Sequence, residues 1–198
     1  MDSWKDGIPS NKFLDVLSLF NNKFVLDYGC GNGWASIALS KLGALEIDSV
    51  DVSKNVVNVL DFYKEIYNIN NINCFAIDSN WLSLQESNHY EGFFSSNVID
   101  VIPLDMSKEI IKEASRIVKD NSYVVFSLNY YVDVEIMAKK GCQVKGNQIY
   151  IDGILRLTSL TDEEWSKIFR QYFKEINLIY FSWPSEKEEK RRLFILRK

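Results

Sequence analysis

The stretch that decides the fold is Val25-Leu26-Asp27-Tyr28-Gly29-Cys30-Gly31-Asn32-Gly33. It ends a short apolar run at residues 23–27 that predicts a strand, and apolar residues at helical spacing follow over residues 34–42. A glycine-rich loop between a strand and a helix lets backbone amides and the helix N-terminus bind a ligand. Gly29 and Gly31 allow a tight turn and leave room for the ligand to approach. The sequence therefore predicts a ligand site at this loop.

Asp27, two positions before the first glycine, argues against a dinucleotide ligand. Its carboxylate would repel a pyrophosphate but would attract a ligand that carries an ammonium and a sulfonium. Trp34 also stands where a dinucleotide fold would have its last glycine. A nicotinamide-dependent oxidoreductase would need a catalytic tyrosine–lysine pair as well, and we find none. The loop therefore favours a cationic ligand over NAD.

Strand-like and helix-like segments alternate through the first two thirds of the chain. Further strands are predicted at residues 45–52, 73–77, 92–96 (with Val98) and 123–128. Ser53 is expected to cap a helix that reaches residue 67, and Ser107 to cap a second helix before the fifth strand. Such alternation implies parallel strands joined by right-handed crossovers.

The last third has a different pattern. Gly146-Asn147 and Asp152-Gly153 are turn dipeptides between strand-like pieces. Thr161 and Glu164 form a capping box for a helix to about residue 172, and two closing strands are predicted at residues 176–181 and 192–196. These segments predict an antiparallel hairpin at the end of the sheet.

The expected fold is a doubly wound α/β fold. It has a mostly parallel, seven-stranded Rossmann-like sheet in a three-layer αβα sandwich, with an antiparallel C-terminal hairpin. No repeat or linker divides the 198 residues, so we expect one domain. Its parts are an N-terminal lid or helix at residues 1–22 (with Trp4, Ile8 and Pro9), a cofactor-binding core at 23–129, an acceptor-site insertion at 130–160, and closing elements at 161–198.

Composition excludes several classes of protein. The formal charge of −4 disfavours a nucleic-acid partner, and the cluster Lys187, Lys190, Arg191 and Arg192 is interleaved with glutamates, as in a solvated turn. No long apolar run or signal peptide is visible, so we expect no membrane span and a cytoplasmic location. Three separate cysteines and one histidine predict reduced thiols and no metal site.

Residues 25–33, VLDYGCGNG, resemble the first motif of the Rossmann-like (class I) S-adenosylmethionine-dependent methyltransferases. Further matches follow in the family's order. Asp51 in SVDVS resembles the acid that holds the ribose hydroxyls, and Ile77-Asp78-Ser79 resembles the adenine-contacting segment. Residues 96–103 and 110–129 resemble the segment after strand four and the following helix and strand. The resemblance covers roughly residues 23–129, with Asp120-Asn121 in place of a proline–glycine turn.

The resemblance implies S-adenosylmethionine as cofactor and S-adenosylhomocysteine as product. It also implies a set of cofactor-binding residues: Asp27, Gly29, Cys30, Gly31, Gly33, Asp51, Val52, Asp78, Ser79 and Asn97. In-line methyl transfer from a sulfonium requires orientation of the two reactants and no nucleophilic side chain. Where the acceptor loses a proton, Asp100 is the first candidate base and Tyr130 the second. Asp100 stands where small-molecule members often carry histidine.

The expected function is therefore methyl transfer to a small-molecule acceptor, whose site we place near Tyr130 and Tyr131, after strand five. The family's Asn/Asp-Pro-Pro-Tyr motif is absent, because Asn97 is followed by Val-Ile-Asp, and this disfavours a DNA substrate. A non-catalytic domain that binds the cofactor is one alternative, and a transferase acting on protein or RNA is another. The sequence leaves the methylated atom and the oligomeric state open.

Overall fold

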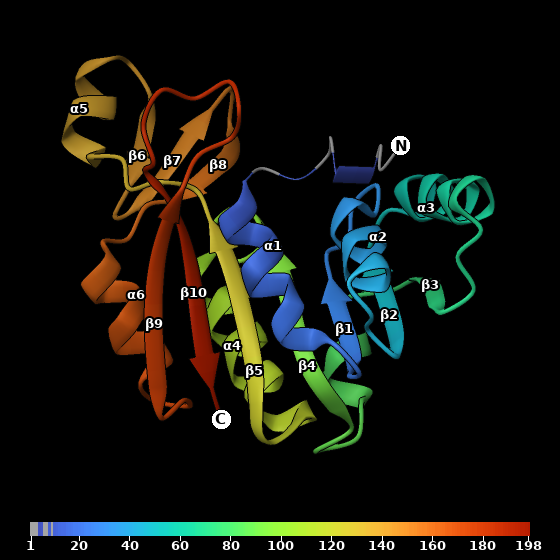
Figure 1. Cartoon of the computed structure of the whole chain (residues 1–198). Coiled ribbons are helices and arrows are strands. Elements are labelled where there is room, and N and C mark those ends of the chain that lie inside the picture. Colours follow the sequence, from blue (N-terminus) through green and yellow to red (C-terminus); the bar gives the residue numbers. More distant parts are fainter. Residues whose placement is uncertain (1–3, 6–7, 9) are drawn as a thin grey trace.

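The computed structural model describes residues 4–5, 8 and 10–198. Its main sheet has seven strands in the order β3-β2-β1-β4-β5-β10-β9 (Figure 1). The strands are β1 (Phe24–Tyr28), β2 (Glu46–Asp51), β3 (Ile72–Ala76), β4 (Tyr90–Ser96), β5 (Val118–Leu128), β9 (Glu175–Phe181) and β10 (Arg191–Arg197). β1 to β5 pair in parallel, while β10 runs antiparallel to both β5 and β9. The mostly parallel, seven-stranded sheet with an antiparallel closing hairpin is thus confirmed.

Helices cover both faces of the main sheet, which gives the predicted three layers. They are α1 (Asn11–Leu17), η2 (Ser18–Phe20), α2 (Trp34–Lys41), α3 (Lys54–Tyr67), η3 (Trp81–Leu84), α4 (Leu104–Ile117) and α6 (Asp162–Phe169). Buried residues of α1, α2 and α3 form one apolar cluster, and those of α4 and α6 form a second. Each face of the sheet therefore has its own hydrophobic core.

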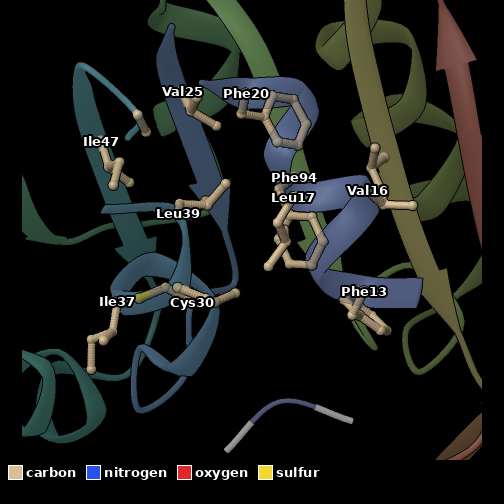
Figure 2. Close-up of a cluster of buried hydrophobic side chains, with 14 of the residues drawn as sticks. Phe13, Val16, Leu17, Phe20, Val25, Cys30, Ile37, Leu39, Ile47 and Phe94 are labelled. Atoms are coloured by element: carbon tan, nitrogen blue, oxygen red, sulfur yellow. The ribbon is translucent and has the colours of Figure 1, made fainter. Parts of the chain in front are cut away.

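The strands supply both cores because successive side chains point to opposite faces. On β1, Val25 belongs to the α1 cluster and Leu26 to the α4 cluster; on β4, Phe94 and Phe93 divide in the same way. Figure 2 draws Phe94 and Leu17 of α1 among the side chains of the first cluster. Burying a side chain of this size contributes about 1.5–3 kcal/mol, so these strand residues fix the layers.

Residues 134–158 form a small unit after β5. It contains α5 (Val134–Lys139) and a three-stranded antiparallel sheet of β6 (Gln143–Lys145), β7 (Gln148–Ile151) and β8 (Ile154–Thr158). Both turn dipeptides lie where they were predicted. Asp152 and Gly153 have φ of 52° and 74°, the left-handed pair that a two-residue hairpin requires.

Of the three predicted helix caps, one is confirmed, one is wrong and one has the predicted position without a side-chain hydrogen bond. The capping box of Thr161 and Glu164 is confirmed at α6. The cap at Ser107 is wrong, because Pro103 is the N-cap residue and α4 begins at Leu104. Ser107 instead lies inside the helix, where its hydroxyl donates to the carbonyl oxygen of Ile99 at 2.6 Å. Ser53 is at the N-cap of α3, although its side chain makes no capping hydrogen bond.

The N-terminal segment is described in part. Pro9 lies outside the described residues, so the structure does not bear on its predicted place in a lid. Ile8 is buried in the α1 cluster and Trp4 packs against that cluster. In the part of the chain that the structure describes, no helix has both the length and the apolar character to cross a bilayer.

Candidate functional site

The glycine loop follows β1, at the place where the strand order reverses. From β1 the sheet continues to β2 and β3 on one side and to β4 and β5 on the other. Open α/β sheets bind ligands outside the carboxyl ends of the strands at such a switch point. The fold therefore puts the loop where a ligand site is expected.

The three glycines of the loop have different surroundings. Gly29, Gly31 and Gly33 all have positive φ, at 74°, 53° and 84°. A Cβ atom on Gly29 would lie 2.2 Å from Val98 Cγ2, and one on Gly33 would lie 2.1 Å from Leu60 Cδ1. A Cβ atom on Gly31 would meet nothing within 4 Å. Two glycines thus permit close packing of the loop, while the third borders open space that a ligand can fill.

This difference predicts unequal effects of two alanine substitutions. Gly33→Ala should lower the free energy of unfolding by about 2–4 kcal/mol, because it adds overpacking to an unfavourable φ. Gly31→Ala, with only the unfavourable φ, should cost about 1–2 kcal/mol. Urea denaturation of both variants measures the difference. Equal losses would show that the Leu60 contact is relieved without cost.

Asp51 connects the end of β2 to the loop. Its Oδ2 accepts a hydrogen bond from the Gly31 amide at 3.1 Å, and its Oδ1 accepts one from the Ser53 amide at 2.8 Å. The side chain is half-buried and also lines a cavity. Asp51 thus holds a negative charge beside the space in front of Gly31.

Asp27 is buried behind the loop, with 1% of its surface exposed. Its Oδ2 accepts a hydrogen bond from the Ser36 hydroxyl, which in turn accepts one from the Ser49 hydroxyl at 2.8 Å. Burial raises the pKa of Asp27 to about 7, against the lowering effect of the Ser36 hydrogen bond. The charge of Asp51 raises this pKa further. Asp27 therefore changes its protonation state near neutral pH.

The side chain of Cys30 points away from the open side of the loop. It lies in the α1 cluster beside Ile37 (Figure 2), and burial raises the pKa of its thiol. Its backbone amide donates to Val50 O at 2.9 Å. The Trp34 ring likewise packs edge-on against Phe13. Cys30 thus belongs to the core, and the half-buried Trp34 packs against it.

A cavity of about 350 Å³, here called the loop cavity, lies beside the glycine loop. Five of the predicted cofactor-binding residues line it: Gly29, Asp51, Val52, Ser79 and Asn97. Its other described lining residues are Tyr28, Ile77, Leu82, Ser83, Val98, Val101, Ile102, Met106, Glu109, Ile110 and Glu113. Most of these are apolar, so the cavity suits a flat ring, while Ser83 of η3 and the α4 residues Glu109 and Glu113 add polar groups to its wall.

Two of the predicted contacts to the cofactor differ in their surroundings. Asp78 is exposed, and its Oδ1 accepts from the Asn80 amide at 2.9 Å, so it stabilises a turn while its neighbour Ser79 faces the cavity. The backbone amide of Asn97 donates to Ser127 O at 2.8 Å. Its buried Oδ1 has no hydrogen-bond partner among the described residues. Asn97 thus offers a ligand an unused acceptor.

The two candidate bases lie in different surroundings. Asp100 has no exposed surface, and its Oδ2 accepts from Asn129 N at 2.6 Å and Asn129 Nδ2 at 3.0 Å. Burial raises its pKa. Tyr130 lines a second cavity, here called the tyrosine cavity. Since Asp100 cannot touch a ligand in this conformation, the geometry favours a positioning role for it, and its role as base stays a prediction.

Two arginines that the sequence analysis did not select hold parts of the site. Arg116 of α4 donates to Gln85 O at 2.7 Å and Leu82 O at 3.2 Å, which fixes η3 as a wall of the loop cavity. Arg192 is 1% exposed, so its assignment to a solvated turn is wrong. Its Nε donates to Asn129 O at 2.8 Å. Glu113, three residues before Arg116, could have indicated an ion pair on the helix that holds Arg116 in place. No neighbouring residue in the sequence indicated that Arg192 is buried.

The strand order, the glycine loop and the cavity at the switch point define a Rossmann-like domain of the class I methyltransferase type. Residues 25–121 match a family model described as a methyltransferase domain. These residues carry a Rossmann-like methyltransferase domain, similar to the S-adenosylmethionine-dependent methyltransferases that the first motif had indicated.

Relatives and solved structures extend the comparison. Ribosomal protein L11 methyltransferase of Prochlorococcus marinus (strain AS9601) is 30% identical over 111 residues, which are 55% of this chain and 35% of that protein. Ubiquinone biosynthesis O-methyltransferase of Paraburkholderia phymatum is 27% identical over 133 residues, 67% of this chain and 56% of that protein. This chain thus spans about a third to just over half of these relatives.

A solved structure of similar fold is magnesium protoporphyrin IX methyltransferase from Synechocystis PCC 6803 with bound SAM. It aligns with a TM-score of 0.68 at 16% identity, over 99% of this chain and 80% of that chain. At this identity the likeness concerns the fold.

Proposed function

We propose that this chain binds S-adenosylmethionine in the loop cavity and transfers its methyl group to a small-molecule acceptor. The observation that carries the proposal is the position of Asp51, a carboxylate held between the open side of Gly31 and an apolar cavity. A ribose has two neighbouring hydroxyl donors that a carboxylate can accept, and a purine needs apolar walls. This combination of groups matches an adenosyl ligand.

Other residues of the loop cavity fit the same ligand. The unpartnered Oδ1 of Asn97 can accept a hydrogen bond from it, and Ile77, Leu82 and Val98 supply apolar surface for the purine. Ionised Asp27, behind the loop, would attract the ligand's ammonium group. The bound sulfonium supplies an activated methyl carbon. The part left to this chain is to hold the ligand, orient the acceptor and exclude water.

The acceptor class rests on weaker support. One relative is named for ribosomal protein L11, while the others are named for ubiquinone biosynthesis and magnesium protoporphyrin IX. The formal charge of −4 argues against an RNA acceptor, and we place the small molecule against the insertion at residues 130–160. We also propose that the chain forms one domain, with the N-terminal segment, cofactor-binding core, insertion and closing elements described above. A protein acceptor, suggested by the L11 relative, is the second candidate.

Calorimetric titration tests the cofactor. Wild-type protein should bind S-adenosylmethionine and S-adenosylhomocysteine but not NADH. Asp51→Ala should weaken adenosyl binding about 10- to 100-fold, because charge-assisted hydrogen bonds are lost. Asp61→Ala is the matched control, since Asp61 is an exposed aspartate of α3 that pairs with Lys64. Absence of adenosyl binding, or a preference for NADH, would refute the proposal.

The acceptor class needs a second assay. Labelled S-adenosylmethionine is incubated with the protein and with the small-molecule or macromolecular fraction of a cell extract. Label transfer in the first fraction supports a small acceptor, and transfer only in the second supports a protein or RNA acceptor. Cofactor binding without transfer in either fraction would favour the non-catalytic alternative.

A further inference from the structure

The tyrosine cavity is a second hollow, of about 320 Å³. Tyr130 and Tyr131 follow β5, Tyr180 lies on β9, and Arg192 lies at the start of β10. Its remaining described lining residues are Asp162, Glu189 and Lys190. A volume of this order holds a single-ring molecule. The three tyrosines are 42%, 46% and 43% exposed, so each offers accessible surface to an aromatic ligand.

Arg192 is the least exposed of these residues, at 1%. Two of its three nitrogens have partners: Nε donates to Asn129 O at 2.8 Å and Nη1 to Leu160 O at 2.7 Å. The third, Nη2, has no hydrogen-bond partner among the described residues. A buried donor without a partner is unfavourable, and an arginine cannot lose its proton to avoid this. Nη2 is therefore a binding group that the described protein atoms leave unused.

The acidic residues of the tyrosine cavity are already engaged. Asp162 accepts from Arg192 Nη1 at 3.2 Å and from the Tyr180 hydroxyl. Glu189 pairs with Lys12. The unsatisfied group is thus a cationic donor, whose best partner is an oxyanion such as a carboxylate. Tyrosine rings beside a buried, unpartnered guanidinium nitrogen together favour an aromatic carboxylate.

A shared polar connection joins this cavity to the loop cavity. Asp100 accepts from the amide of Asn129, the residue that precedes Tyr130, while its own carbonyl oxygen accepts from the Thr158 amide at 2.7 Å. Val101 and Ile102, directly after Asp100, line the loop cavity. The linings of the two cavities are therefore linked through Asp100 and Asn129.

We propose that the tyrosine cavity binds the methyl acceptor, and that this acceptor is a small aromatic carboxylate held by Arg192 and the tyrosine rings. The acceptor assignment rests on the proposed function; the anion site itself stands on the geometry of Arg192. Nη2 is covered in this conformation. We therefore expect the exposed tyrosine rings to shift when the carboxylate enters.

The test compares 4-hydroxybenzoate with its neutral analogue 4-hydroxybenzamide by calorimetry, with and without S-adenosylhomocysteine. Wild-type protein should bind the acid at least about 10-fold more tightly than the amide, the effect of one charge-assisted hydrogen bond. Tyr131→Ala should weaken acid binding about 5- to 10-fold through lost stacking. Phe62→Ala, which removes an exposed ring from α3, should leave it unchanged.

Arg192→Gln should abolish the preference for the acid. Because that variant removes buried hydrogen bonds, the acid–amide comparison on wild type and the Tyr131 variant decide the question if it fails to fold. Equal binding of acid and amide, no binding of either, or no effect of Tyr131→Ala would overturn the site. S-adenosylhomocysteine binding is measured on the same samples. Its failure would refute the proposed function while acid-specific binding would still support the anion site.

Discussion

Asp100→Ala should lower the free energy of unfolding by about 3–5 kcal/mol. The substitution removes a fully buried carboxylate that accepts two hydrogen bonds from Asn129, at 2.6 and 3.0 Å. It also removes a negative charge that interacts with the buried guanidinium of Arg192. The two amide donors would keep their desolvation cost without their partner, and the guanidinium would lose one nearby negative charge while keeping its bonds to Asn129, Leu160 and Asp162. Urea denaturation followed by circular dichroism measures the loss.

Asp105→Ala is the matched control for this experiment. Asp105 lies in the first turn of α4, and its side chain is fully exposed with a single 4.0 Å contact to Lys108. An exposed pair of this kind contributes at most about 0.2–1 kcal/mol. A loss below about 1 kcal/mol for Asp100→Ala would show that the buried connection adds little to stability.

Asp100→Asn separates positioning from base catalysis. The amide keeps the shape of the side chain, and its oxygen can still accept the hydrogen bonds that Asn129 now donates to Oδ2, so this variant should lose less stability than alanine. If Asp100 positions Asn129 and Tyr130, turnover should fall together with acceptor binding. A loss of turnover with folding, cofactor binding and acceptor binding intact would instead support Asp100 as the base.

The order of strands and helices could be predicted because its signals are local. Each strand is a short apolar run, and the glycine loop stands between a strand and a helix. Boundaries were less predictable where tertiary contacts decide them. β5 begins at Val118, five residues before the prediction, because Val118 pairs with Tyr90 of β4. Ser107 resembles a cap in sequence, but the helix already begins at Leu104, after the N-cap residue Pro103.

The loop side of the candidate site was predictable for the same reason, since Gly29 and Asn97 directly follow β1 and β4 and Asp51 ends β2. The opposite side was not. Arg192 lies in a sequence of alternating charges, which is typical of an exposed turn. It is buried because its partners Asn129 and Leu160, 63 and 32 residues away, reach it only in the folded chain. No window of sequence contains that information.

Asp27→Asn should remove a large pH dependence of stability. In the wild type, burial raises the pKa of Asp27 from 3.8 to about 7. Between these values the folded protein keeps the proton while the unfolded chain releases it, so the free energy of unfolding falls as pH rises. A shift of about three pH units corresponds to about 4 kcal/mol at most, fully lost above pH 7. Asparagine carries no titrating proton, so the variant should lack this loss.

The measurement is the difference in unfolding free energy between wild type and Asp27→Asn from pH 4 to pH 8, because the other carboxylates cancel in it. The wild type should become less stable relative to the variant as pH rises through this window. Asp61→Asn, on the exposed face of α3, should show no such change. A pH-independent difference would contradict the raised pKa.

If the loop cavity binds the proposed cofactor, its ammonium should lower the pKa of Asp27. Added S-adenosylhomocysteine should therefore move the pH dependence of stability to lower pH.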